Sequence, residues 1–314
     1  MSSYHTPVLL NESVSALVRN PSGIYADVTF GGGGHTAGIL SRLNEDGHVI
    51  AFDRDADALE NTIDDRRLTM VRGDFRFIRN YVMELAHGRE DLRDKLEDGL
   101  DGILADLGVS SHQFDTAERG FSFRYEAPLD MRMNREGGMT AGDVVNSYPK
   151  EDLERIFRLY GEVENAGKLA ALIVSARTVS PIGTTGELDR AIAPALPKFA
   201  EHKYLAKVYQ ALRIEVNHEM RSLEKFLEGA AETLKEGGLL AVITYHSLED
   251  RMVKNYIRTG NVEGREEKDF YGAVSSPLEA VNRKPLVPRE EEIASNTRAR
   301  SAKLRVAVKR EGGR

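Results

Sequence analysis

The chain has 314 residues, enough for one α/β domain that carries an insertion or a second small domain. Hydrophobic residues make up 41% and charged residues 30%, an ordinary globular balance. The longest apolar runs, such as GLLAVITY, are too short to span a bilayer, so no membrane partner is expected. Because the N-terminal stretch lacks the pattern of a signal peptide, we expect a cytoplasmic protein.

The absence of cysteine excludes disulfides, thiolate metal sites, iron–sulfur clusters and thiol nucleophiles, and no metal site is predicted. The net charge of -7 hides an asymmetry. From Val281 to Arg314 there are ten Lys or Arg against four Asp or Glu, a net +6, which leaves -13 for the rest. Such a basic tail is more often solvated surface than a nucleic-acid contact, and both interpretations stay open.

The first third of the chain alternates strand patterns with helix patterns, which predicts βαβ units and a parallel, doubly wound sheet. Glycines end the first strand and open the first helix of this series. The expected strands are Ile24–Phe30, Val49–Phe52, Leu68–Val71 and Ile103–Leu107, and the expected helices are His35–Leu43, a stretch from Asp55, and Ile78–Leu85, with Glu90–Asp101 a charged, solvated segment.

The pattern then breaks, because residues 110–197 contain no convincing core strand. Helices are expected there at Lys150–Tyr160, Ala166–Thr178 and Leu188–Ala195, the last with Thr184 and Glu187 at capping-box spacing. The α/β pattern resumes with a helix over Tyr209–Lys235 that ends at Gly237-Gly238, a strand over Leu239–Tyr245, a helix from Ser247 with Asp250 at box spacing, and a strand over Leu304–Val308. We therefore predict an α/β, Rossmann-like sheet formed by residues 1–110 and 206–314, with an all-helical insertion over 111–205.

The turn Gly31–Gly34 lies between a strand and a helix, where glycines let the backbone approach a ligand closely. Asp53 ends the next strand, 19 residues after Gly34, and a carboxylate there can accept hydrogen bonds from both hydroxyls of a ribose. Together these features indicate a cofactor that contains adenosine, although a capped glycine turn with no ligand remains the simpler alternative.

Two cofactors fit this turn. Gly32, Gly34 and Ala37 match the dinucleotide fingerprint of an NAD-dependent oxidoreductase. Asp27 ahead of the glycines also fits the S-adenosylmethionine pattern of methyltransferases. Asp74-Phe75, after the third strand, could bind adenine through the acid and the ring, although a lone Phe is more often part of a core.

Asp106 ends the fourth strand and His246 follows the fifth, so both are expected at the carboxyl edge where doubly wound sheets bind ligands. Asp106 could meet a donor and an acceptor there, or it could cap its own turn. His246 could be a base or a hydrogen-bonded packing residue.

Several long, irregular strings resemble those of the bacterial S-adenosylmethionine-dependent cytosine-N4 methyltransferases of small-subunit (16S) ribosomal RNA. The matching strings run from near one end of the chain to the other: HTPVLLNES at 5–13, DVTFGGGGHT at 27–36, AFDRD at 51–55, LADLGVSSHQFD at 104–115, ERGFSFR at 118–124, PLDMRM at 128–133, YHSLEDR at 245–251 and NTRARSAKLR at 296–305. Gly32 and His112 depart from the commonest family strings, and His112 could change how Gln113 is presented.

The resemblance implies S-adenosyl-L-methionine as cofactor, the small ribosomal subunit as partner, and the helical insertion as a substrate-recognition domain. The donor contacts that it implies are Gly33, Gly34, His35, Asp53, Phe75, Asp106 and Gln113. As catalytic residues we predict Asp106 and, less directly, His246. Without cysteine, which methylation at carbon 5 of a pyrimidine usually requires, a nitrogen is the expected acceptor.

Two other functions are weighed against this one. They are the NAD-dependent oxidoreductase, which rests on the glycine fingerprint alone, and a catalytically silent ribosome-assembly factor that binds RNA. Intact Asp53, Asp106 and Gln113 argue against lost cofactor binding. The sequence does not determine whether the chain acts as a monomer or a homodimer.

Overall fold

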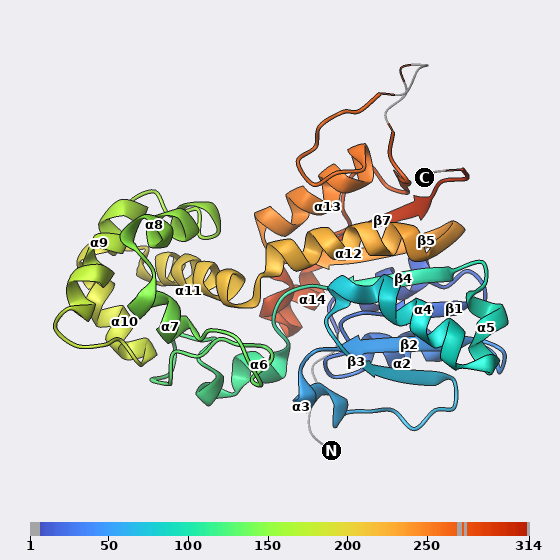
Figure 1. Ribbon diagram of the computed structural model, residues 1–314, viewed down its shortest axis with the longest axis horizontal. Helices are drawn as coiled ribbons and strands as arrows, with labels where there is room; N and C mark the ends of the chain where they lie inside the picture. The colour runs from blue at the N-terminus through green and yellow to red at the C-terminus, as the bar shows by residue number, and fades with distance from the viewer. Residues whose placement is uncertain (1–6, 269–271, 273–274, 313–314) are drawn as a thin grey trace. The chain divides into compact units, whose positions relative to one another are not determined.

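The structure is a computed structural model that describes residues 7–268, 272 and 275–312, with only the backbone of Ser111 and His112 (Figure 1). The first two residues of the string HTPVLLNES and the side chain of His112 therefore lie outside the described part. The chain forms two compact units: Met1–Gly108 with Arg221–Arg314, and Val109–Met220.

The strands of the described residues form one seven-stranded sheet in the order β3-β2-β1-β4-β5-β7-β6. Their bounds are β1 Ile24–Asp27, β2 His48–Asp53, β3 Leu68–Arg72, β4 Leu100–Asp106, β5 Leu234–Thr244, β6 Leu278–Ala280 and β7 Lys303–Lys309. Strands β1 to β5 pair in parallel, as predicted. Strand β7, for which the sequence predicted no direction, is antiparallel to β5 and β6, so the sheet is mixed. An alternating pattern indicates which residues are buried, not the direction of the strand.

Helices cover both faces of the sheet, which confirms the doubly wound arrangement. Ile24 and Ala26 of β1 pack into a core with α4 (Ile78–Gly88), α5 (Glu90–Leu96), α12 (Glu219–Thr233) and α13 (Ser247–Thr259). Tyr25, which points to the opposite face, packs with α1 (Leu10–Leu17) and α2 (Gly34–Leu40). The short helices α3 (Ala56–Leu59) and α14 (Glu290–Ser295) complete this unit. None of the helices in the described ranges is long and apolar enough to cross a membrane.

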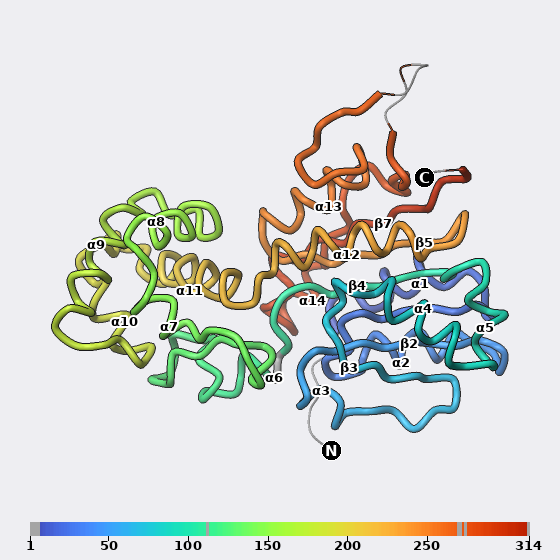
Figure 2. The backbone as a smooth tube through the Cα atoms, viewed as in Figure 1, coloured from blue at the N-terminus to red at the C-terminus, as the bar shows by residue number. Residues whose placement is uncertain are grey.

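The second unit is helical, and Figure 2 shows it as the green-to-yellow stretch of chain between β4 and α12. Its α-helices are α6 (Ser111–Asp115), α7 (Ala141–Ser147), α8 (Lys150–Leu159), α9 (Ala166–Arg177), α10 (Thr185–Ile192) and α11 (Glu201–Asn217). The capping box of Thr184 and Glu187 is confirmed at the start of α10. Pro128 and Thr184 form an isolated antiparallel β-bridge in this unit.

The helix predicted over Tyr209–Lys235 is in fact two helices. Residue His218 adopts a left-handed conformation with φ 51°, which ends α11 before α12 begins. Residues of α11 such as Leu205 and Leu212 belong to the core of the insertion. The second unit therefore extends to Met220, beyond the expected boundary at residue 205. Gly237 and Gly238 lie within β5 rather than after a helix.

Elements that the sequence did not predict are short or strongly charged. Helix α5 lies in the segment expected to be solvated, where Leu92 and Leu96 are nevertheless buried. Helix α1 has no side-chain cap of its own, so its sequence carries no start signal. Tertiary packing rather than local propensity specifies these elements.

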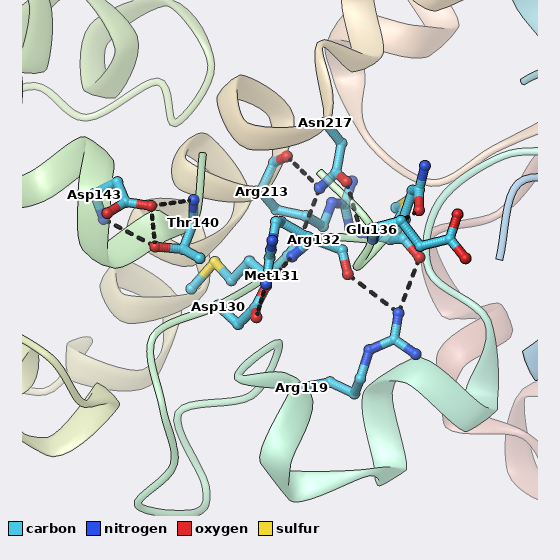
Figure 3. Close-up of polar contacts among 11 residues, drawn as sticks. Arg119, Asp130, Met131, Arg132, Glu136, Thr140, Asp143, Arg213 and Asn217 are labelled. Atoms are coloured by element: carbon cyan, nitrogen blue, oxygen red, sulfur yellow. Dashed lines mark hydrogen bonds and ion pairs between the residues drawn. The ribbon is translucent and has the colours of Figure 1, made fainter. Parts of the chain in front are cut away.

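A network of polar contacts holds the segment around Met131 within the insertion (Figure 3). The Asn217 amide accepts a hydrogen bond from the Met133 N–H at 2.8 Å, and donates to the carbonyls of Met131 at 2.8 Å and Arg213 at 2.9 Å. Arg119, which is buried, donates to the carbonyls of Arg132 and Met133 at 3.1 Å. Because Met131 has φ 61°, an uncommon conformation for a side chain of this size, the segment needs these contacts to keep its shape.

We expect Asn217→Ala to lower the free energy of unfolding of the insertion by about 2–4 kcal/mol, because buried backbone groups lose their partners. Chemical denaturation followed by circular dichroism measures this change. The control is Lys198→Ala at an exposed position of the insertion, which should change stability by less than about 0.5 kcal/mol. Equal effects of the two substitutions would contradict this account.

Candidate active site

Three parallel neighbours in the sheet each end in an aspartate: Asp27 on β1, Asp53 on β2 and Asp106 on β4. Residue Asp27 pairs with Ala51 of β2 and Leu104 of β4, so the three strands end close to the same level. The carboxyl ends of parallel strands are where this class of sheet binds ligands. This edge is therefore the candidate active site.

The glycine turn lies at this edge, between β1 and α2. Gly31 and Gly33 have positive φ values of 51° and 76°. A Cβ on Gly33 would lie 2.9 Å from the Phe30 ring, and one on Gly34 would clash with Pro7. The turn thus needs glycine for its conformation and for the close approach of two other segments.

Asp53 ties the glycine turn to the end of β2. Its two carboxylate oxygens accept hydrogen bonds from the N–H groups of Gly31 at 2.8 Å and Asp55 at 2.9 Å. Burial raises the pKa of Asp53, and these two hydrogen bonds oppose the shift. Each oxygen keeps lone-pair capacity, so a structural role does not exclude contact with a ribose.

Asp27 is fully buried beneath the turn. It accepts hydrogen bonds from the Thr36 hydroxyl at 2.7 Å and the Thr29 N–H at 3.1 Å. Burial raises the pKa of its carboxyl, and the nearby His35 lowers it. A buried carboxylate in this position holds α2 against the end of β1.

Asp106 has the most elaborate surroundings of the three. One carboxylate oxygen accepts a hydrogen bond from the Tyr245 hydroxyl at 2.7 Å, and the other lies 3.7 Å from Nδ1 of His35. Burial raises the pKa of Asp106 from 3.8 to about 6; His35 and the Tyr245 hydrogen bond lower it, while Asp27 and Glu249 raise it. Tyr245 was not predicted, although it directly precedes His246 in the sequence.

His246 has a structural role at the start of α13. It is the N-cap of α13 and forms a capping box with Glu249, whereas Ser247 and Asp250 were expected to do so. Its Nε2 lies 3.0 Å from a Glu249 oxygen without the geometry of a hydrogen bond. The other Glu249 oxygen accepts the Tyr245 N–H at 2.9 Å, which links this cap to the partner of Asp106.

The remaining predicted donor contacts, and Asp74 beside them, already have partners within the protein. Phe75 packs edge-to-face on Phe226, with ring centroids 5.3 Å apart, at the border of the core. Asp74 caps the turn at Phe75 and forms ion pairs with Arg54 and Arg76, so its carboxylate is already engaged. Gln113 belongs to the second unit, where its amide oxygen accepts the Ser110 N–H at 3.2 Å.

The edge is suited to a cationic ligand. Burial raises the pKa values of Asp27, Asp53 and Asp106, which means that the protein alone stabilises their ionised forms poorly. A positive charge placed beside them would favour ionisation. S-adenosylmethionine carries such a charge on its sulfonium, and its ribose and amino-acid parts offer donors to carboxylates.

We expect Asp106→Asn to stabilise the protein at pH 7.5 more than at pH 5. A carboxyl whose pKa rises on folding to about 6 binds more protons in the folded state, so its contribution to stability is present at low pH and is lost as the pH rises through that value. Asparagine does not titrate but can still accept from Tyr245. Urea denaturation of both proteins at the two pH values measures the difference.

The control is Asp94→Asn on the exposed side of α5, which removes one negative charge far from this edge of the sheet. A stability gain of Asp106→Asn that is the same at both pH values, or that grows toward pH 5, would contradict the assignment.

Comparison with known proteins places this site in a family. The MraW methylase family matches residues 2–310. The ribosomal RNA small subunit methyltransferase H of Phocaeicola vulgatus is 55% identical over 307 residues, which cover 98% of each chain. The protein of the same name from Flavobacterium johnsoniae is 52% identical over 306 residues, again covering 98% of each chain. The glycine turn and the three strand-end aspartates lie inside both alignments, and the chain belongs to the MraW methylase family.

Proposed function

We propose that this chain transfers the methyl group of S-adenosyl-L-methionine to the exocyclic N4 of a cytosine in the decoding region of small-subunit ribosomal RNA. The observation that carries the proposal is the glycine turn with three aspartates at one edge of the sheet. Relatives that match along nearly the whole chain are named ribosomal RNA small subunit methyltransferases. These names support a reaction on the small ribosomal subunit, and we infer that it takes place in the cytoplasm.

The residues at the edge fit the parts of the donor. Asp53 would accept hydrogen bonds from the ribose, and the Gly33–Gly34 backbone would lie against the donor at the N-terminus of α2. Asp106 would face the methionine part. Phe75 and Gln113 stay proposed contacts, Phe75 for the adenine ring and Gln113 from the insertion.

The donor supplies a methyl group already activated by its sulfonium, so the protein needs to position and deprotonate the amine. As the N4–carbon bond forms and the sulfur–carbon bond breaks, the nitrogen must lose one proton. We assign this proton to Asp106, because its carboxylate ends β4 at the carboxyl edge of the sheet and its side chain is 23% exposed. His246, engaged with Glu249, would act only by orienting Tyr245 and thus Asp106.

The insertion and the basic tail would bind the RNA. Seven arginines are candidates for this role: Arg119, Arg124, Arg132 and Arg135 in the insertion, and Arg298, Arg300 and Arg305 in the tail. Arg298 is half-buried, and the other six divide into two groups. Arg119 is buried, Arg132 pairs with Asp130, and Arg305 pairs with Asp250, so these three hold the protein together. The exposed members are Arg124, Arg135 and Arg300. These three are the proposed RNA contacts.

The test of the function is mass spectrometry of nucleosides from small-subunit RNA incubated with the protein and S-adenosylmethionine. N4-methylcytidine should form at one position and only with the donor. The family match does not support the oxidoreductase, and binding of NADH with no affinity for S-adenosylhomocysteine would contradict the proposed function. Tight subunit binding without methyl transfer would favour the silent assembly factor.

We expect affinity for S-adenosylmethionine to fall when the pH is lowered from 8 to 5, because protonation of Asp106 removes a negative charge beside the donor. Asp106→Asn should weaken binding at pH 8 and remove most of this dependence. Calorimetry with S-adenosylhomocysteine is the matched control. This ligand keeps the amino-acid part but lacks the sulfonium charge, so its affinity should depend less on pH. If the Asn variant keeps the full pH dependence of the wild type, Asp106 does not face the donor.

We expect charge reversal of Arg124, Arg135 and Arg300 together to weaken subunit binding and flatten its salt dependence, since each phosphate contact contributes about one unit to the slope. Affinity for S-adenosylhomocysteine should not change. The control is Arg66→Glu, an exposed arginine just before β3 and therefore at the opposite edge of the sheet. If the triple variant binds subunits with the wild-type salt slope, the RNA lies elsewhere.

A further inference from the structure

Helix α1 is capped by a residue from the other end of the chain. Its N-cap position, Leu9, has a left-handed conformation with φ 52° and offers no side-chain cap. Instead, a carboxylate oxygen of Glu292 in α14 accepts the Leu9 N–H at 2.7 Å, across 283 residues of sequence. A carboxylate at a helix N-terminus satisfies a free N–H and interacts favourably with the helix dipole.

The residues just before this cap lie on the glycine turn. Pro7 is in such close contact with Gly34 that a Cβ on Gly34 would clash with the Pro7 ring. The carbonyl of Val8 accepts a hydrogen bond from Nε2 of His35, at 3.1 Å. Segment Pro7–Leu9 is therefore attached to both the turn and the first residues of α2.

His35 in turn faces the carboxylate at the centre of the proposed site. When Nε2 carries the proton and donates to Val8, Nδ1 points toward Asp106, 3.7 Å away. The position of Val8 thus sets the orientation of the imidazole beside Asp106. Leu9, whose N–H donates to Glu292, is the next residue after Val8 in this segment.

We propose that Glu292 is a positioning residue of the methyl-donor site: by capping α1 it holds Val8 and Pro7 against His35 and the glycine turn. Glu292 belongs to the run Glu290–Glu292, whose other two members are exposed. The inference rests on the proposed function only for the identity of the donor. Loss of the cap should therefore weaken donor binding without affecting RNA binding.

The experiment compares Glu292→Ala, Glu292→Gln and Glu292→Asp, with Glu291→Ala as the matched control from the same helix. Affinity for S-adenosylhomocysteine is measured by calorimetry without RNA, and the KM for small subunits is measured separately. Glu292→Ala should weaken affinity roughly 2- to 30-fold, the range that the loss of one helix cap allows. The subunit KM should stay at the wild-type value.

The two conservative variants separate contact from charge. The glutamine side chain keeps an oxygen within reach of the Leu9 N–H, so Glu292→Gln should bind the ligand nearly as tightly as the wild type. The aspartate side chain keeps the charge but is one methylene too short, so Glu292→Asp should bind as weakly as Glu292→Ala. Hydrogen exchange of the peptide that contains Leu9 should speed up in the alanine and aspartate variants alone. If Glu292→Ala does not fold, the ranking of glutamine above aspartate still tests the proposal.

Three results would overturn the inference. One is faster exchange at Leu9 with donor affinity within twofold of the wild type, which would make Glu292 a purely structural cap. Another is a higher donor affinity of Glu292→Asp than of Glu292→Gln, which would show that the negative charge matters rather than the hydrogen bond to Leu9. The third is an equal loss in Glu291→Ala. Failure of the methylation reaction itself would appear in the wild type and leave these comparisons intact.

Discussion

The candidate site depends on the parallel pairing of β1, β2 and β4. This pairing brings the aspartates at the ends of the three strands to one edge of the sheet. Carboxyls that are partly or fully buried, as these three are, cost free energy unless they are hydrogen-bonded. The chain offsets that cost with the Gly31 N–H, the Thr36 hydroxyl and the Tyr245 hydroxyl. Burial nevertheless keeps the pKa values of the three carboxyls raised.

The parts of this site that the sequence predicted are those encoded locally. A β-branched run that ends in glycines predicts β1 and the turn. Asp53 and Asp106 could be placed at strand ends because each comes directly after, or one residue before, the last apolar residue of its strand pattern. The break in the strand pattern after Ser110 predicts the insertion for the same reason. The resemblance to a family of cytosine-N4 methyltransferases predicted the methyl donor and the RNA substrate. The family match confirms that the chain is a methylase.

The parts that could not be predicted depend on contacts between distant segments. Nothing near Glu292 indicates that it caps a helix 283 residues away. The break at His218 depends on a left-handed residue inside a continuous amphipathic pattern, so the period alone predicts one helix. Arg119 looks like a nucleic-acid contact in the sequence, yet it is buried and supports backbone carbonyls. The box at the start of α13 was misassigned because a histidine side chain rarely serves as the cap.

The measurement that tests the central claim most directly is a crystal structure of the protein with S-adenosylmethionine bound. The account predicts that the ribose hydroxyls lie within hydrogen-bond distance of Asp53, and that the methionine part lies beside Asp106 with the glycine turn against the donor. It would be contradicted by a donor bound away from the carboxyl ends of β1, β2 and β4, with Asp53 bonded only to the N–H groups of Gly31 and Asp55 as it is here.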